Sequence, residues 1–265
     1  MTFPLPPNAT IGIVGGGQLG RMSALAAARL GYRCHILTPE PDSPAGQVAA
    51  GVTLGDYEDP EVLRAFAARV DVISFEFENV SAAGLDLLAS LKPVRPSPAV
   101  LRLSQDRVAE KTFLNAAGVP TAPWRAVDSL DALHAAAAAL GLPAILKTTR
   151  LGYDGKGQAL LRAEAELAPA FADLAPHPLV LESFVDFACE VSVVVARGAD
   201  GALAAFDTVQ NSHRDHILDT TLAPAPIPPE TAAAAQAMAR HVAEALELVG
   251  LLAVEMFVTA HGRVL

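Results

Sequence analysis

A glycine-rich loop flanked by lysines, residues 147–158, is the segment of this sequence best suited to chemistry. An apolar run ends at Lys147, and three glycines, Asp154 and Lys156 follow before Gln158. Glycines let the backbone approach a ligand closely, and backbone N–H groups together with lysine ammoniums can hold phosphate oxygens. The spacing is not that of a Walker A loop. A plain hairpin turn with solvated lysines is the alternative, but the density of glycine and charge favours a nucleotide-phosphate loop.

A second glycine-rich segment, residues 15–20, contains the spacing G-x-G-x-x-G after a predicted strand. This spacing is typical of dinucleotide sites, in which phosphate lies at a helix N-terminus. The dinucleotide fingerprint also requires an acidic residue at the end of the second strand. That strand ends here at Thr38-Pro39, and Glu40 lies beyond the proline. NAD or FAD is therefore disfavoured, while another phosphate-bearing ligand and a purely structural turn both stay open.

Three glutamates in the second half are candidates for the rest of a nucleotide site. Glu182 and the backbone near Val185 could hold an adenine amino group, and Glu190 could accept hydrogen bonds from ribose hydroxyls, although ordinary strand-end charges would look the same. Glu255 stands inside an apolar strand-like run, 253–257, where burial would require a partner or a metal. Mg²⁺ held by this carboxylate and by substrate phosphates would meet that need.

Composition narrows the class of protein. A chain of 265 residues forms one large or two medium domains. Hydrophobic residues make up 52% but aromatic residues only 5%, so alanine supplies much of the apolar content. The formal net charge is −10 and no basic block is present, which argues against nucleic acid as a partner.

The ends and the cysteines favour a cytoplasmic protein. Residues 1–20 combine prolines and glycines without a basic start, which argues against a membrane span and against a signal peptide. Cys34 and Cys189 are far apart and outside any metal-like spacing, so we expect reduced thiols.

The first hundred residues alternate strands and helices, which favours a parallel, doubly wound sheet of the α/β class. Strands are predicted at 10–14, 33–37, 52–54 and 71–75, and helices at 18–30, 59–69 and after Ser81. The proline-dense segment 92–98 predicts a domain boundary. Beyond it we expect helices at 106–117, 128–140 and 231–248, strands at 144–148, 158–161, 179–182, 190–197, 203–209 and 251–258, and a final hairpin that begins its return at 263–265.

Motifs spread over nearly the whole chain resemble the ATP-grasp superfamily and, within it, the N5-carboxyaminoimidazole ribonucleotide synthetases of purine biosynthesis. They are GGGQLGRM (15–22), QDRVAEK (105–111), TAPW (121–124), GYDGKGQ (152–158), EVSVVVAR (190–197), QNSHRDHIL (210–218) and AVEMF (253–257). The resemblance implies a Rossmann-like pre-ATP-grasp domain over 1–104 that binds substrate, then an α+β ATP-grasp domain over 105–265.

The reaction that the resemblance implies joins bicarbonate to 5-aminoimidazole ribonucleotide, cleaving ATP to ADP and phosphate through carboxyphosphate. It also implies Mg²⁺ or Mn²⁺ as the metal and a homodimer. Formate-dependent glycinamide ribonucleotide transformylases and biotin carboxylases share the ATP machinery, but Tyr153-Asp154 and GGGQLGRM speak against both.

The resemblance also assigns individual residues. The implied nucleotide contacts are Arg107, Lys147, Gly152, Tyr153, Asp154, Gly155, Lys156, Gly157, Gln158, Glu182, Ser183, Phe184, Val185, Glu190 and His213. The implied catalytic residues are Tyr153, Asp154 and Lys156, which together with Gly17, Gln18, Leu19 and Glu76 would also bind the aminoimidazole ribonucleotide. Glu255 would be one magnesium ligand.

Two departures from the family pattern stand out. His216 occupies a position where the family has glycine. The sequence also ends before three features that the family carries: an Asn-Glu pair that supplies a second magnesium ligand, a His-Asn-Ser-Gly-His segment and a small C-terminal domain. We therefore expect a C-terminally truncated chain with little or no turnover.

Overall fold

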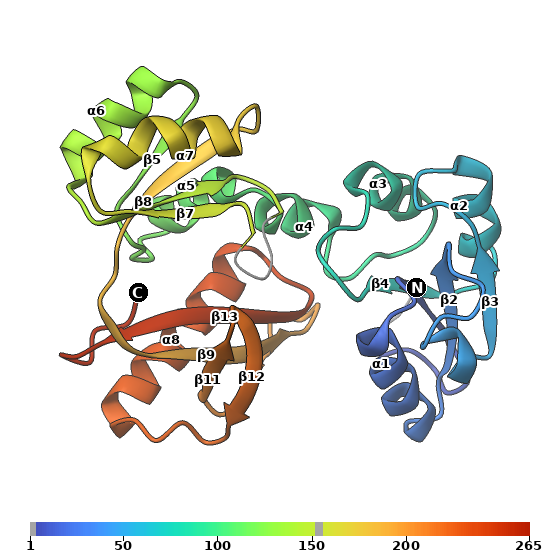
Figure 1. Ribbon diagram of the computed structural model, residues 1–265. Helices are drawn as coiled ribbons and strands as arrows, with labels where there is room; N and C mark the ends of the chain where they lie inside the picture. Colours follow the sequence, from blue (N-terminus) through green and yellow to red (C-terminus); the bar gives the residue numbers. More distant parts are fainter. Residues whose placement is uncertain (1–3, 152–155) are drawn as a thin grey trace. The chain divides into compact units, whose positions relative to one another are not determined.

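The computed structural model describes residues 4–151 and 156–265 (Figure 1). The chain forms two compact units, Met1–Arg102 and Leu103–Leu265. Each unit has a hydrophobic core of its own. Within the described ranges, every helix is too short or too polar to cross a bilayer.

The first unit is built on a parallel sheet of four strands in the order β3-β2-β1-β4. The strands are β1 (Thr10–Val14), β2 (Arg33–Thr38), β3 (Gly51–Leu54) and β4 (Val72–Phe75). The connecting helices are α1 (Gln18–Arg29), the 3₁₀ turn η1 (Gly46–Val48), α2 (Pro60–Ala67) and α3 (Ala82–Leu91). Ile13 packs into the cluster that contains α1, and its neighbour Val14 packs into the cluster that contains α2 and α3. The sheet is therefore covered on both faces, and the predicted doubly wound α/β architecture is confirmed.

Local capping explains where two of these helices begin. The Asp59 side chain accepts hydrogen bonds from the N–H groups of Glu61 and Val62, and Pro60 occupies the first helical position of α2. Ser81 accepts from Gly84 in the same way at α3. These side chains satisfy backbone donors that have no partner inside the helix.

The second unit contains two antiparallel sheets, in the orders β5-β8-β6-β7 and β10-β9-β11-β12, with β13 also paired to β9. The first sheet comprises β5 (Trp124–Val127), β6 (Ala144–Thr148), β7 (Gln158–Leu161) and β8 (Leu179–Ser183). The second comprises β9 (Phe187–Arg197), β10 (Leu203–Ala205), β11 (Val209–Arg214), β12 (Ile217–Leu222) and β13 (Gly250–Thr259). The helices are α4 (Pro98–Ser104), which ends in this unit, α5 (Arg107–Ala116), α6 (Leu130–Leu140), η2 (Glu164–Glu166), α7 (Leu167–Leu174) and α8 (Pro229–Ala245).

Helices cover one face of each sheet in the second unit (Figure 1). Leu133 of α6 shares a buried cluster with Leu146 of β6 and Leu181 of β8, and α7 joins the cluster through Leu167. α8 packs against β9 and β13. Because β8 leads into β9, residues near this connection lie where the chain passes from one sheet to the other.

One part of the strand prediction is wrong. The predicted strand 203–209 is split into β10 and the start of β11, and neither β5 nor β12 is among the predicted strands. All six residues of β12 are exposed, so its sequence lacks the alternation of buried and exposed side chains that indicates a half-buried strand.

A tight turn at Asp215 and His216 joins β11 to β12. Both residues have positive φ, 52° and 65°, and Arg214 pairs with Ile217 across the turn. Two positive-φ residues in a two-residue hairpin are the mark of a type I′ turn, which glycine adopts more readily than other residues. His216 thus stands where the backbone favours the glycine that the family resemblance implies.

Candidate active site

The predicted phosphate loop is closed at its base by a β-hairpin. Lys147 of β6 is paired with Gln158 of β7, and the Thr148 N–H donates to the Gly157 carbonyl at 2.9 Å. Gly157 has φ of +67°, which suits glycine. Lys156 is exposed. The predicted residues Gly152, Tyr153, Asp154 and Gly155 lie outside the described residues, so their roles stay predictions.

Arg107 holds the start of this loop against helix α5. Its Nη1 donates to the carbonyls of Thr148 at 2.9 Å and Leu151 at 2.7 Å, and its backbone N–H donates to Thr149 at 2.8 Å. Asp106 caps the helix by accepting from the N–H groups at its start. The sequence suggested Arg107 as a phosphate contact, whereas here its guanidinium fixes the backbone that leads into the phosphate loop.

Glu182 is a buried carboxylate held between two lysines. Its Oε2 lies 3.1 Å from Lys147 Nζ and its Oε1 lies 3.3 Å from Lys111 Nζ. Burial alone would raise the pKa of Glu182, but the two ammoniums hold this pKa below its usual value. Lys111 was not among the predicted site residues. Its spacing of four residues from Arg107, which puts both on one helix face, was the signal that could have found it.

The residues predicted to hold adenine follow Glu182 directly. The Ser183 N–H donates to the Pro123 carbonyl at 2.8 Å, and the Phe184 N–H donates to Pro143 at 3.2 Å. Phe184 is exposed and Val185 is partly buried. Because the lysines occupy the Glu182 carboxylate, an adenine amino group would have to be read by the backbone around Val185.

Glu190 and His213, both predicted for the nucleotide, are brought together on neighbouring strands. His213 Nδ1 lies 3.1 Å from Glu190 Oε2. β9 and β11 pair at Asn211 and Glu190, and the β11–β12 register shifts between Ser212 and His213. The imidazole therefore fixes the orientation of a partly exposed carboxylate, which suits recognition of a sugar hydroxyl.

Glu255 is not buried, contrary to the argument drawn from its apolar neighbours. Side chains alternate along the first part of β13, and Glu255 lies on the exposed side while Met256 is buried. Glu110 of α5 is close enough to respond to it. Burial raises the pKa of Glu110, and the charges of Glu182 and Glu255 raise it further against the opposing effect of Lys111 and Arg107.

Few of the described side chains are placed to ligate a metal ion together. Among residues 4–151 and 156–265, no group of three or more His, Cys, Asp or Glu side chains could hold an ion. Mg²⁺ commonly takes one or two protein carboxylates and obtains its other ligands from phosphates and water. The exposed Glu255 fits that role as a single oxygen ligand.

Glu76 of the first unit lies on the glycine-rich loop at the start of α1. Its Oε1 accepts from the Gly17 N–H at 2.5 Å, and its Oε2 accepts from the Gly20 N–H at 2.6 Å. A Cβ atom at Gly15 would lie 2.4 Å from Glu76 Cγ, and one at Gly17 would lie 2.8 Å from Oε1. These glycines therefore make room for a carboxylate of the chain itself. Gln18 and Leu19, also predicted for substrate, are exposed beside it.

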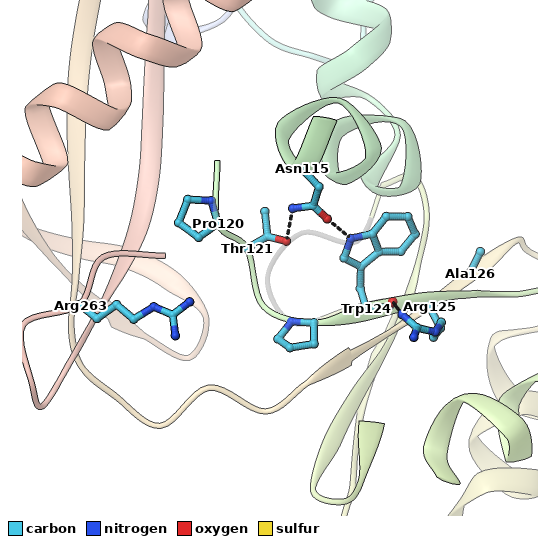
Figure 2. A pocket seen from close by; sticks show the side chains of 8 residues that line it. Asn115, Pro120, Thr121, Trp124, Arg125, Ala126 and Arg263 are labelled. Carbon is cyan, nitrogen blue, oxygen red and sulfur yellow. Dashed lines mark hydrogen bonds between the residues drawn. The ribbon is translucent and has the colours of Figure 1, made fainter. Parts of the chain in front are cut away.

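The TAPW motif has a structural role. Trp124 Nε1 donates to Asn115 Oδ1 at 2.9 Å, and Asn115 Nδ2 donates to Thr121 Oγ1 at 3.0 Å. Figure 2 shows Asn115 joining these two side chains at the edge of a cavity of about 470 Å³ that is also lined by arginines 125 and 263. The predicted nucleotide residues are absent from its described lining. The motif ties α5 to β5, and Trp124 of β5 is the strand partner of Glu182 in β8.

Comparisons with known proteins agree with both units. A family model for the ribonucleotide synthetase preATP-grasp domain matches residues 8–105, and one for the ATP-grasp domain matches residues 112–265. The N5-carboxyaminoimidazole ribonucleotide synthase of Brucella melitensis is 50% identical over 98% of this chain and 73% of its own length. That of Bacillus subtilis is 40% identical over 98% of this chain and 68% of its own length.

Solved structures give the same result. An ADP complex of N5-carboxyaminoimidazole ribonucleotide synthetase is 41% identical with a TM-score of 0.95, over 100% of this chain and 70% of that chain. The enzyme of Aspergillus clavatus, in complex with ADP and 5-aminoimidazole ribonucleotide, is 28% identical with a TM-score of 0.90, over 97% of this chain and 68% of that chain.

Proposed function

The chain belongs to the N5-carboxyaminoimidazole ribonucleotide synthase family of ATP-grasp ligases, and we propose that it carboxylates 5-aminoimidazole ribonucleotide with bicarbonate, cleaving ATP to ADP and phosphate. The observation that carries this proposal is the assembly of predicted nucleotide residues from separate strands around the β8–β9 connection. Lys147 meets Glu182 on one side of it, and Glu190 meets His213 on the other.

In this proposal ATP lies along that assembly. Lys147 and the backbone of the loop at 152–158 bind its phosphates, with Arg107 holding the start of the loop in place. The backbone from Ser183 through Phe184 to Val185 binds adenine. Glu190 accepts from the ribose hydroxyls while His213 keeps its carboxylate oriented.

Glu255 would bind Mg²⁺ together with the ATP phosphates, and Mn²⁺ could take the same ligands. The ion would neutralise phosphate charge during transfer. The remaining work of phosphoryl transfer is positioning and charge stabilisation, which lysines and backbone N–H groups provide. Tyr153, Asp154 and Lys156 are proposed to act on the carboxyl group and the imidazole amine.

The first unit is proposed to hold the aminoimidazole ribonucleotide. Glu76 is fixed by Gly17 and Gly20, which leaves its remaining lone pairs as acceptors for ribose hydroxyls. Gln18 and Leu19 are exposed beside it. With its own carboxylate at the start of α1, this loop is a poor cradle for the pyrophosphate of NAD, because two anions would compete for the same N–H groups.

The test compares two substrate pairs on the same chain. Binding is measured by calorimetry in the presence of ADP, and ADP release is measured with a coupled assay. We expect the chain to bind aminoimidazole ribonucleotide and not to bind glycinamide ribonucleotide. We also expect that any ADP release requires aminoimidazole ribonucleotide together with bicarbonate. Binding or ADP release only with glycinamide ribonucleotide and formate, or binding of neither ribonucleotide, would contradict the proposal. Homodimer formation and a cytoplasmic location are further expectations, the first of which sedimentation analysis would check.

A further inference from the structure

The buried Glu182 carboxylate makes two ion pairs at once. Lys111 contacts one of its oxygens and Lys147 contacts the other. Lys111 comes from α5, whereas Lys147 and Glu182 come from adjacent strands of one sheet. Glu110 of α5 is a second carboxylate that interacts with Glu182 and Lys111, and the charges of Arg107 and Glu255 also act on it. A structural ion pair would need only one of the two lysines.

The two lysines differ in their access to solvent. The Lys111 side chain is 13% exposed and the Lys147 side chain is 21% exposed, while Glu182 is 9% exposed. Lys147 also stands at the end of β6, where the phosphate loop begins. Lys147 is therefore the lysine that can turn toward a phosphate, and Lys111 is the one that stays within the protein.

If Lys147 turned to a phosphate without a second lysine present, Glu182 would be left buried and unpaired. A buried charge that loses its partner is strongly destabilised, and it would also repel the approaching phosphate. With Lys111 in place, the carboxylate keeps an ion pair throughout.

We propose that Lys111 is a positioning residue for ATP binding, one that holds Glu182 so that Lys147 can leave it and bind a phosphate. This inference rests on the proposed ATP site. In this proposal Lys111 does not contact the nucleotide, so its role differs from that of a second phosphate-binding lysine.

The test is a double-mutant cycle on the affinity for Mg²⁺ and β,γ-imido-ATP, measured by calorimetry. The variants are Lys111→Met, Glu182→Gln and the two combined, with Lys111→Arg as the conservative replacement. Lys92→Met, at the end of α3 in the other unit, controls for the loss of one positive charge. Thermal unfolding followed by circular dichroism checks that each variant folds.

We expect Lys111→Met to weaken binding roughly 10- to 100-fold, the range for a lost hydrogen bond to a charged group. Lys111→Arg should recover most of this loss, and Lys92→Met should change little. In the Glu182→Gln background, Lys111→Met should have little further effect, because the amide leaves no buried charge to hold.

Two results would overturn the inference. In the first, Lys111→Met does not change the affinity for the nucleotide. In the second, Lys111→Met weakens binding in the Glu182→Gln background as much as it does in the unmodified chain, which would make Lys111 a direct phosphate ligand. If Lys111→Met does not fold, Lys111→Gln takes its place in the cycle. Failure of the unmodified chain to bind the nucleotide would instead contradict the proposed function.

Discussion

Glu76 Oε2 accepts a hydrogen bond from the backbone N–H of Gly20 at 2.6 Å, so a side chain from the end of β4 fills the space at the start of α1. α1 has no capping side chain of its own, because its N-cap residue is Gly17. A distant carboxylate thus performs the task that serine or aspartate performs at other helices, and its negative charge also suits the N-terminal end of the helix dipole.

Glu76→Ala should therefore lower the free energy of unfolding of the first unit. Two N–H groups at the helix start lose their acceptor, which should cost about 1–3 kcal/mol. Urea unfolding measures the change. The exposed Glu40→Ala removes the same charge nearby and should cost much less. Equal effects of the two substitutions would show that charge, and not the contact with Gly17 and Gly20, matters.

His216→Gly should stabilise the second unit. Glycine adopts the positive φ of this turn without the strain that a histidine side chain brings, which is worth about 1 kcal/mol. His261→Gly is the matched control, because His261 also lies in a hairpin turn but is not among the residues with positive φ. There glycine should reduce stability by increasing the freedom of the unfolded chain. Thermal unfolding of both variants measures these changes in stability. A loss of stability in His216→Gly would contradict the turn assignment.

The stability of the second unit should depend on Glu182 at acidic pH. The pKa of this carboxyl is lowered in the folded chain relative to its ordinary value of 4.5. The ionised form is thus favoured by folding, and this contribution is present above pH 4.5 and lost as the pH falls through the folded pKa. Unfolding measured from pH 6 downward should show a steeper loss for the unmodified chain than for Glu182→Gln. Parallel curves would mean that the two lysines do not stabilise the ionised form.

Glu110 should show the opposite dependence. Its pKa is raised, so the protonated form is favoured by folding. Its contribution is fully present below pH 4.5 and is lost as the pH rises through the folded pKa. Glu110→Gln should therefore gain stability relative to the unmodified chain as the pH rises from 4 toward neutrality, which the same unfolding series would measure. The reverse trend would show that Lys111 and Arg107 outweigh the burial of Glu110.

Glu190→Gln should remove the preference for a complete ribose. The unmodified chain should bind at least one of 2′-deoxy-ADP and 3′-deoxy-ADP about 10-fold or more weakly than ADP. This loss is expected when a hydroxyl that donates to a carboxylate is removed. The variant should bind all three with similar affinity in calorimetry. Glu244→Gln, on the exposed side of α8, controls for the loss of charge. A ribose preference that survives in Glu190→Gln would place the hydroxyl contact elsewhere.

The periodic parts of the fold could be read from the sequence, and the contacts between distant segments could not. The parallel sheet and the helices capped by Asp59 and Ser81 were predictable because alternation and capping are local signals. β12 was missed because it has no buried face.

At the site, the resemblance supplied residue identities but not their partners. The pairing of Glu190 with His213 depends on the register of β9 and β11, and the contact of Lys111 with Glu182 depends on how α5 packs. The exposure of Glu255 was misjudged because apolar neighbours in a strand do not reveal which face the central residue occupies.

Helix α5 carries both Arg107, which holds the start of the phosphate loop, and Lys111, which holds Glu182. Because Arg107 and Lys111 are about one helical turn apart, the geometry of α5 fixes the distance between the two groups that they hold. Inserting a single residue between them would rotate Lys111 by about 100° and raise it along the axis. α5 could then no longer hold the carbonyls of Thr148 and Leu151 and the Glu182 carboxylate at the same time, even though every side chain would still be present.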